Sequence, residues 1–518
     1  MIWEIAKTLG LYTLYMTIGY IIFLVYSMIV KPFLFWRKYR GYNNVYTRSS
    51  FIPMLGDIYY HLKSIKAGYV HYFHLIETAD EVNKHDMKVV NQGITPVLSI
   101  VSNKAMTEFI NLAPAKIDKA GYNAVFSVCA PKTMALMRTK VGMPKRKMMV
   151  GLFDLTRASK YIPGILDRCE EVCSNLKNNE TYNLSYEMIR LTFGVVTSVL
   201  YGDDIHTLVN QLRDFEKPDG TFEKINLCEM KIRCIKSYVM QQFHPFTLML
   251  PFLRNYCLVQ PFKREWNNLQ RSFDAVKEIV SKSQDTKSIY HQAKKADLYD
   301  DEGLLQEMFT ITGAAFQSSS EFICSSLYFL NKHPETLKKL RAELSENGWT
   351  KGADLKKVCT IDNIQNCEYL NMVVKEALRI DTPFPEAFPY QAYEDVEICG
   401  VPVKKGTYIV VDFISAHYDE KHWMKPKEFI PDRFDTESEF YKEAMKQGQT
   451  PHVFSRRSFN HGVRKCPGQT LAILQVKVIL AYLVTNLDVE ISDELLNKYG
   501  IGFGLGSEIP LTAKVIKR

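Results

Sequence analysis

The longest uninterrupted apolar segment of the chain lies near its N-terminus. Residues 8–30 form a run of 23 residues without a charged side chain, rich in Leu, Ile, Tyr and Met. Such a run is long enough to cross a bilayer as a helix and is longer than the core of a signal peptide. Lys31, Arg37, Lys38 and Arg40 follow it, and the positive-inside rule then places the remaining chain in the cytosol. The alternative interpretation is a buried helix of a soluble protein.

Helical periodicity dominates the rest of the chain, with short strand-like pieces in the second half. Helices are predicted for residues 368–380 and 470–487, and a further helical run ends near His333. Residues 396–403 and 408–413 have the pattern of strands. The pattern therefore predicts a mainly α fold with small β-sheets.

Two segments interrupt this pattern, and neither marks a second domain boundary. Residues 243–253 are apolar and broken by two prolines, which is compatible with a core segment or with a loop that dips into lipid. Residues 281–295 are polar and predict an exposed loop. We expect a membrane anchor with a basic juxtamembrane segment over residues 1–50 and a single domain over residues 51–518.

Composition excludes several classes of protein. The chain has 518 residues, of which 46% are hydrophobic and 24% charged, values that are ordinary for a globular protein with a sizeable core. The formal net charge of +8 includes no long basic run of the kind that binds nucleic acid. The 11 cysteines show no repeated spacing, so we expect reduced thiols instead of a disulfide framework.

One cysteine has neighbours that suit it to chemistry. Cys466 directly precedes the predicted helix over residues 470–487, where unpaired backbone N–H groups and the positive end of the helix dipole favour a thiolate. Pro467 suits a first helical turn, and Gly468 lets a flat group approach the backbone. The alternative is a buried structural cysteine.

The stretch around this cysteine matches the pattern Phe-x-x-Gly-x-Arg-x-Cys-x-Gly and resembles the haem-binding loop of a cytochrome P450. The resemblance implies that Cys466 is the axial thiolate ligand of a b-type haem iron. It further implies that Phe459 shields the sulfur from water, that Gly462 and Gly468 let the backbone approach the haem, and that Arg464 binds a haem propionate.

The family's structural signature is present as well. Residues 376–379 supply Glu-x-x-Arg, which places both side chains on one helix face. Residues 431–434, Pro-Asp-Arg-Phe, resemble the family's Pro-Glu-Arg-Phe with Asp in place of Glu. The resemblance implies a buried triad of Glu376, Arg379 and Arg433 that supports the haem loop.

Aligned on His333-Pro334, the preceding helical run covers the family's oxygen-binding motif. Ala314 and Ala315 retain the small residues that open the helix over the haem, but Gln317 replaces the acid and Ser318 the threonine of the proton relay. Serine still offers a hydroxyl, whereas glutamine cannot ionise. A Ser-rich helix face without a catalytic task is the alternative.

The resemblance also places a second haem contact and a docking face. Counted back from Phe153, Arg146 takes the place of the propionate-binding Arg, while Gly142 stands at the usual Trp. The alternative for this segment is a solvated basic turn. Another position where the family often has Arg holds Tyr390 or Gln391. A basic rim on the thiolate side would attract an acidic electron donor; its five members are Lys145, Lys147, Arg456, Arg457 and Lys465.

Together these features imply a single-pass protein of the endoplasmic reticulum membrane with a cytosolic catalytic domain. The implied reaction is insertion of one oxygen atom from O₂ into an apolar substrate such as a sterol or fatty acid, with electrons from a separate NADPH-dependent flavoprotein reductase. One alternative is a haem-thiolate isomerase or dehydratase that rearranges a peroxide without O₂ or reductase. A second alternative is a non-enzymatic haem carrier or gas sensor.

Overall fold

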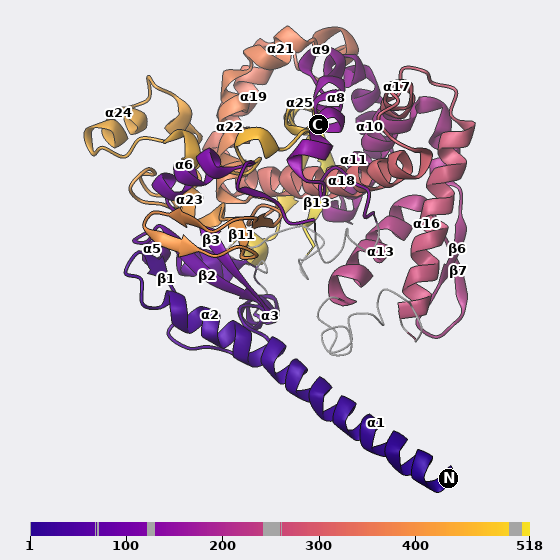
Figure 1. Ribbon diagram of the computed structural model, residues 1–518. Coiled ribbons are helices and arrows are strands. Elements are labelled where there is room, and N and C mark those ends of the chain that lie inside the picture. The colour runs from indigo at the N-terminus through magenta and orange to yellow at the C-terminus, as the bar shows by residue number, and fades with distance from the viewer. Residues whose placement is uncertain are drawn as a thin grey trace.

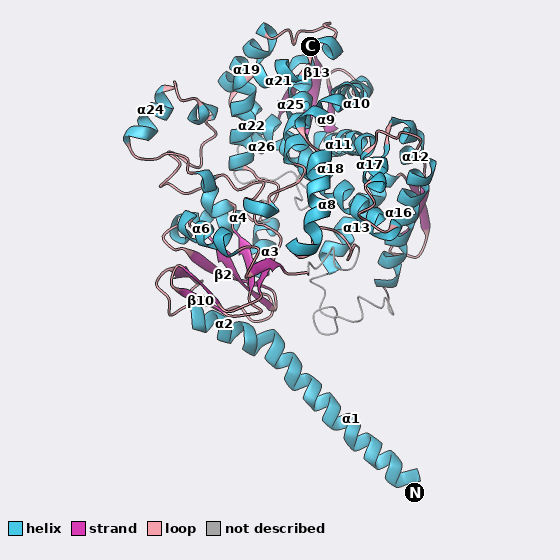
Figure 2. Cartoon of the chain, turned by 45° about the horizontal axis from the view of Figure 1, so that its top comes forward, coloured by secondary structure: helices cyan, strands magenta, loops and turns pink. Residues whose placement is uncertain are grey.

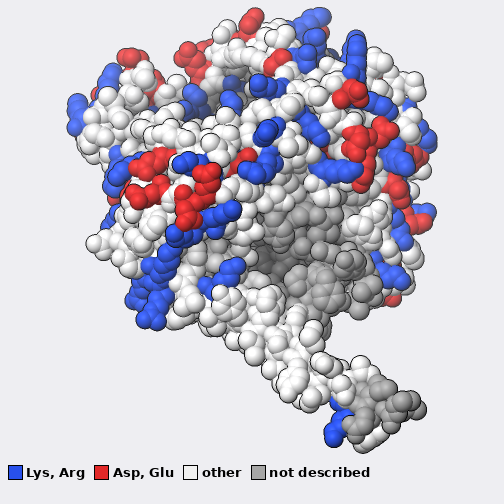
Figure 3. All heavy atoms as spheres, in the orientation of Figure 1, with Lys and Arg blue, Asp and Glu red and all other residues white. Residues whose placement is uncertain are grey.

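The computed structural model describes residues 2–67, 69, 72–121, 130–241, 260, 262–496 and 510–518. Its N-terminal helix α1, Ile2–Val25, continues through a π-helical turn, Tyr26–Val30, into α2, Lys31–Tyr39. Helix α1 projects away from the body of the protein (Figure 1), and its flank is almost free of charged side chains (Figure 3). The predicted helix over residues 8–30 is therefore confirmed, and it extends further at both ends.

The described residues include two helices that are long and apolar enough to cross a membrane. The first covers Lys7–Tyr39, and only 11% of its most apolar window is buried in the protein. The second is α25, Gln469–Asn486, of which 56% is buried. Helix α25 is a core helix of the body, so the exposed N-terminal helix alone has the character of an anchor.

The helical body is built around α18, Asp301–Lys332, a helix of 32 residues. It packs against α11, Leu184–Tyr201, along with α22, Glu368–Ile380, and α25 (Figure 1). The Oγ1 of Thr192 on α11 donates to the Phe316 carbonyl on α18 at 2.8 Å. These helices share the largest apolar core of the described chain.

The remaining helices of the described residues lie around these four or beside the strands (Figure 2). They are α3 Ile58–Lys66, α4 Phe73–Glu77, α5 Ala79–Val82, α6 Asn103–Leu112, α8 Thr139–Leu152, α9 Leu155–Ala158, α10 Ile162–Asn175, α12 His206–Asn210, α13 Leu227–Gln241, α16 Phe262–Lys282, α17 Ile289–Lys295, α19 Pro334–Glu346, α20 Leu355–Val358, α21 Ile361–Asn366, α23 Ile414–His417, α24 Glu439–Lys446 and α26 Asp493–Leu496.

A six-stranded sheet forms a second core near the start of the body. Its order is β1 Val45–Tyr46, β2 Met87–Gln92, β3 Thr95–Ile100, β11 Tyr408–Val411, β8 Tyr390–Ala392 and β4 Ile117–Lys119. The smaller sheets are the hairpin of β9 Val396–Ile398 and β10 Val401–Val403, the pair β6 Arg213–Glu216 and β7 Phe222–Ile225, and a three-stranded sheet of β12 Leu487–Ile491, β13 Thr512–Lys517 and β5 Glu180–Asn183. Tyr39 of α2 is buried against the first sheet, and its hydroxyl donates to the Pro402 carbonyl at 2.9 Å.

Most of the predicted elements are confirmed, and one is wrong. The helices expected over 368–380 and 470–487 are α22 and α25, and the strand segments 396–403 and 408–413 contain β9, β10 and β11. The exposed loop expected over 281–295 is wrong, because α17 occupies Ile289–Lys295. Ser288 caps this helix through the His291 N–H, and Ile289 and Ala293 are buried. Residues 243–253 lie outside the described residues.

Candidate active site

The cysteine motif forms a tight loop in front of α25. A 3₁₀ turn covers Gly462–Arg464, and the backbone N–H of Cys466 donates to the Phe459 carbonyl at 2.7 Å. Gly462 has a φ of +72°, a conformation that a side chain would strain, so the glycine is needed for the turn itself. Gly468 is the N-cap of α25. The loop therefore presents the sulfur at the start of a buried helix, as the sequence predicts.

Opposing effects act on the pKa of the Cys466 thiol. Burial raises the pKa of Cys466, while the backbone N–H groups of Gly468 and Gln469 and the charge of Arg146 lower it; the net shift is upward. The helix N-terminus thus lowers the pKa of the thiol, as the sequence predicts, but the loss of solvation on burial raises it by more. A metal cation at the sulfur would reverse this balance, because a coordinating thiol is deprotonated.

Two arginines make hydrogen bonds at this loop: Arg146 reaches it from another helix, and Arg464 belongs to it. The Nε of Arg146, from α8, donates to the Val463 carbonyl at 2.9 Å. The Nη2 of Arg464 donates to the Met134 carbonyl at 2.9 Å, whereas its buried Nη1 has no hydrogen-bond partner among the described residues. A Cβ on Gly142 would lie 3.5 Å from this Nη1. That distance is an ordinary contact, whereas the same Cβ would lie only 3.1 Å from the Cβ of Met137, so a larger residue at position 142 would require Met137 to shift.

A third cation, Lys119, joins them and was not predicted. Its Nζ donates to the Phe388 carbonyl at 2.8 Å and lies 3.6 Å from the centroid of the Tyr390 ring. Burial, followed by the charges of Arg464 and Arg146, holds the pKa of Lys119 well below its ordinary value. The sequence offered no signal for this residue, since a single lysine in a short strand belongs to no motif.

The charge of this cluster is unbalanced, and that imbalance fits an anionic ligand. Asp118 is the carboxylate that acts on Lys119, and it is already engaged by the backbone N–H and hydroxyl of Thr139 at 2.7 and 2.6 Å. Three basic side chains therefore face two carboxylates, Asp118 and Glu307, and Glu307 is itself engaged by the Met134 N–H at 2.7 Å. One guanidinium nitrogen, the Nη1 of Arg464, is buried without a hydrogen-bond partner among the described residues. Burying such charges without partners is costly. The residues present fit the two propionates of a haem held by Cys466.

Helix α18 supplies the other predicted residues. Ala314 is exposed at mid-helix, and Ala315 and Gln317 are partly buried. The Ser318 hydroxyl donates to the Ala314 carbonyl at 2.7 Å, so it is held by its own helix. One residue on, the hydroxyl of Ser319 accepts a hydrogen bond from the Gln475 amide of α25. This contact fixes α18 beside the helix that begins after Cys466.

The expected structural triad is confirmed. The Nε and Nη2 of Arg379 donate to the two oxygens of Glu376 at 2.8 Å each, and the Nε of Arg433 donates to the same carboxylate at 2.8 Å. All three side chains are at least 97% buried. The Asp432 that replaces the family's Glu is outside the triad and pairs with Lys339 at 3.3 Å.

The basic rim is confirmed only in part. Lys147, Arg456 and Lys465 are exposed, and Lys145 is partly buried. Arg457 was wrongly placed on this surface: it is fully buried and donates to the Phe454 and Asp412 carbonyls at 2.7 and 3.0 Å. Its guanidinium is satisfied by backbone oxygens, so its charge stabilises the chain turn before the cysteine loop.

Comparison with known proteins agrees with this geometry. The sequence model of the family described as "Cytochrome P450" matches residues 86–507. The chain is 31% identical to cytochrome P450 3A17 of Cavia porcellus over 247 residues, which are 46% of this chain and 44% of that protein. It is 31% identical to (S)-canadine synthase CYP719A21 of Papaver somniferum over 227 residues, 43% of this chain and 44% of that protein.

A longer match joins it to lithocholate 6-beta-hydroxylase of Mesocricetus auratus, 24% identical over 401 residues that are 75% of this chain and 76% of that protein. The matched segments span less than half the length of the first two relatives. The family model, in contrast, covers most of the 518 residues and includes both the Glu376 triad and the Cys466 loop. The chain therefore belongs to the cytochrome P450 family.

Proposed function

We propose that this protein is a haem-thiolate monooxygenase that inserts one oxygen atom from O₂ into an apolar organic substrate. The observation that carries the proposal is the set of three buried cations, Lys119, Arg146 and Arg464, beside the Cys466 loop. When bound, a haem b would supply the iron that activates dioxygen. Lithocholate 6-beta-hydroxylase, among the relatives, is named for such a hydroxylation.

The chain's own residues would hold the cofactor and manage protons around it. Cys466 would be the axial ligand, and the three cations would neutralise the propionates. Ala314 and Ala315 leave the middle of α18 without a bulky side chain, so a flat group and a substrate could lie against it. Ser318 would pass protons through its hydroxyl, and Gln317 would orient water without exchanging a proton.

Anchoring and electron supply follow from the same proposal. Residues 1–50 would hold the catalytic domain, residues 51–518, on the cytosolic side of the endoplasmic reticulum membrane, with α1 as the single span. Tyr39 packs α2 onto the first sheet, which supports a fixed position of the body relative to the anchor. Exposed Lys147, Arg456 and Lys465 would attract an acidic NADPH-dependent flavoprotein reductase.

The test uses the full chain expressed with ample haem precursor and combined with the reductase in lipid nanodiscs. We expect a red-shifted carbonyl band and reductase-dependent O₂ consumption with apolar lipids that shift the Soret band. Cys466→Ser should lose the carbonyl band, whereas Cys399→Ser, at a partly buried cysteine of the β9–β10 hairpin, should keep it. A Cys466→Ser protein with an unaltered band would refute the proposal.

A second candidate is a haem-thiolate isomerase or dehydratase acting on a peroxide. The observation that favours it is the pair Gln317 and Ser318: the first cannot ionise, and the hydroxyl of the second is donated to the Ala314 carbonyl. Turnover of a lipid hydroperoxide without reductase, together with no reductase-dependent O₂ consumption, would establish this alternative and reject the monooxygenase.

A further inference from the structure

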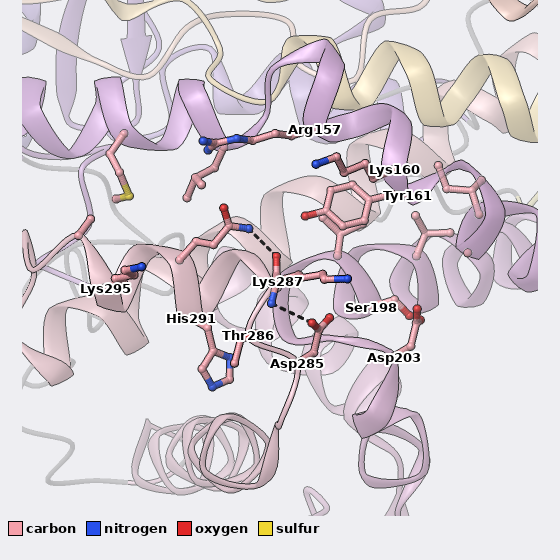
Figure 4. Close-up of a pocket in the computed structure, with 18 residues that line it drawn as sticks. Arg157, Lys160, Tyr161, Ser198, Asp203, Asp285, Thr286, Lys287, His291 and Lys295 are labelled. Carbon is pink, nitrogen blue, oxygen red and sulfur yellow. Dashed lines mark hydrogen bonds between the residues drawn. The ribbon is translucent and has the colours of Figure 1, made fainter. Parts of the chain in front are cut away.

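A cavity whose lining includes no residue of the cysteine loop lies between α8, α10, α11 and the segment that leads into α17 (Figure 4). Its volume of about 820 Å³ is within the range of small-molecule binding sites, about 300–1,000 Å³. It shares no lining residue with the candidate active site. Met148 and Leu152 of α8 line it, on the same helix that carries Arg146.

The inner wall of the cavity is apolar. Leu152, Ile165, Val195 and Val199 line its floor but are each at most 4% exposed, so apolar surface that a ligand can reach is supplied by half-buried Met148 and Tyr161. The ring of Tyr161 forms a further part of the wall, and Figure 4 shows it facing the interior. Such a wall can remove the apolar body of a ligand from water, at about 25 cal/mol per Å² of apolar surface buried.

The rim is basic, and its cations come from both sides of the opening. Arg157 and Lys160 lie on one side, and Lys287 and Lys295 on the other (Figure 4). All four side chains are exposed. The lining also contains two acids, Asp203 and Asp285, and among the described residues neither forms an ion pair within 4.0 Å with any of the four cations; Arg157 is paired at 3.9 Å with Asp154, which lies outside the lining. The rim therefore has an excess of positive charge that its own carboxylates do not neutralise.

We propose that this cavity binds a small amphipathic anion, an apolar body that carries a carboxylate or phosphate group. The apolar body would lie against the wall formed by α8, α10 and α11, and the anionic head would lie between Lys160 and Lys287. A neutral apolar ligand would leave the cations unmatched, and a simple inorganic anion would leave the apolar wall in water. Charge-assisted hydrogen bonds to lysine and arginine favour the combined ligand over both.

The experiment compares three probes on the full-length, haem-loaded protein in nanodiscs, with empty nanodiscs subtracted. Decanoate carries both parts of the expected ligand, decanol lacks the charge, and inorganic phosphate lacks the apolar body. Binding is followed by isothermal titration calorimetry, and the Soret band reports any binding near the haem separately. We expect decanoate to bind at least tenfold more tightly than decanol or phosphate, with one site that leaves the Soret band unchanged.

Two independent variants locate that site. The double charge reversal Lys160→Glu with Lys287→Glu should weaken decanoate binding at least tenfold. Gly164→Leu should block the cavity: Gly164 lines it from α10, and a Cβ there would meet only the Asp203 carboxylate, at an ordinary 3.8 Å. This second variant should weaken both decanoate and decanol.

The matched control is Lys282→Glu with Lys294→Glu, two exposed lysines outside the lining that give the same change of net charge. It should leave decanoate binding unchanged. Equal decanoate affinity in the wild type and in both cavity variants would overturn the proposal. So would phosphate that binds as tightly as decanoate, since the apolar wall would then contribute nothing.

Discussion

The buried triad is the part of the fold where a single substitution should have the largest effect. Glu376 accepts four hydrogen bonds: two from Arg379, one from Arg433, all at 2.8 Å, and one from the Ile430 N–H at 2.9 Å. Glu376→Ala removes the carboxylate that accepts all four hydrogen bonds and leaves two guanidiniums buried without it. Removing one partner of a buried ion pair costs about 3–5 kcal/mol, because the remaining charge is uncompensated. The total free energy of unfolding of a protein is about 5–15 kcal/mol, so this loss is a large fraction of it.

The pH dependence adds a second expectation. Burial alone would raise the pKa of Glu376, but Arg379 and Arg433 outweigh it, and the pKa is held below its ordinary value of 4.5. A carboxyl with a lowered folded-state pKa stabilises the fold above its unfolded pKa and loses that contribution as the pH falls. The difference in stability between wild type and Glu376→Ala should therefore be greatest at neutral pH and shrink as the pH falls below 4.5, so that it is already smaller at pH 4 than at pH 7.

The assay is urea unfolding of the haem-loaded protein at pH 7 and pH 4, followed by far-UV circular dichroism and by the Soret band. Lys446→Ala provides the control, because its pair with Glu443 is exposed and 3.7 Å long. We expect the control to change the free energy of unfolding by less than about 0.5 kcal/mol. A Glu376→Ala protein as stable as this control would refute the argument that the triad holds the core beneath the cysteine loop.

Three further predictions concern single residues. Lys119→Met should speed the transfer of haem to apomyoglobin severalfold, because one of the three cations is lost, while Lys116→Met, at an exposed neighbour, should not. Ser318→Ala should raise the peroxide released per NADPH consumed; fully coupled turnover would show that protons arrive by another route. Glu386→Gln should flatten the pH dependence of stability. Burial raises the pKa of Glu386 to about 7, against the opposing charge of Lys88. Because the folded-state pKa lies above the unfolded value, the wild-type protein loses up to about 3 kcal/mol of stability as the pH rises from 4.5 through 7. Urea unfolding midpoints at pH 5 and pH 8 would measure this loss.

A structural feature could be predicted from the sequence where neighbouring residues determine it. The ten residues before α25 could be interpreted directly, since the turn at Gly462 and the start of the helix at Gln469 are set by neighbouring residues. Helix α22 was predicted with its observed bounds because its apolar face repeats over 13 residues. Helix α17 was missed because it has only seven residues, of which Ile289 and Ala293 are buried, too few for a visible period.

Charged residues were harder to place than apolar ones, because burial of a charge depends on distant acceptors. Arg457 belongs to a basic pair in the sequence, which favours a solvated surface. Its guanidinium donates to the carbonyls of Phe454, Asp412 and Ile100 and to the side-chain oxygen of Asn103, and three of these four residues lie far away in the chain. No local pattern predicts such a set of acceptors.

The cation cluster shows how a site can keep its electrostatics while its sequence departs from a family pattern. The sequence suggested a thinner set of haem contacts, since Tyr390 or Gln391 stands where an Arg is often found. Strands β4 and β8 pair antiparallel, and the register sets Lys119 directly opposite Tyr390. The Lys119 ammonium lies over the Tyr390 ring at 3.6 Å. Lys119 therefore lies one strand away from the position where the family often has Arg, about 5 Å in a sheet, and the charges of Arg464 and Arg146 act on it. If Lys119 neutralises a haem propionate as proposed, the position of the charge in space decides the interaction, and either of two paired strands can carry it. A motif defined along the chain then fails to find such a residue, whereas the register of β4 and β8 places it opposite Tyr390.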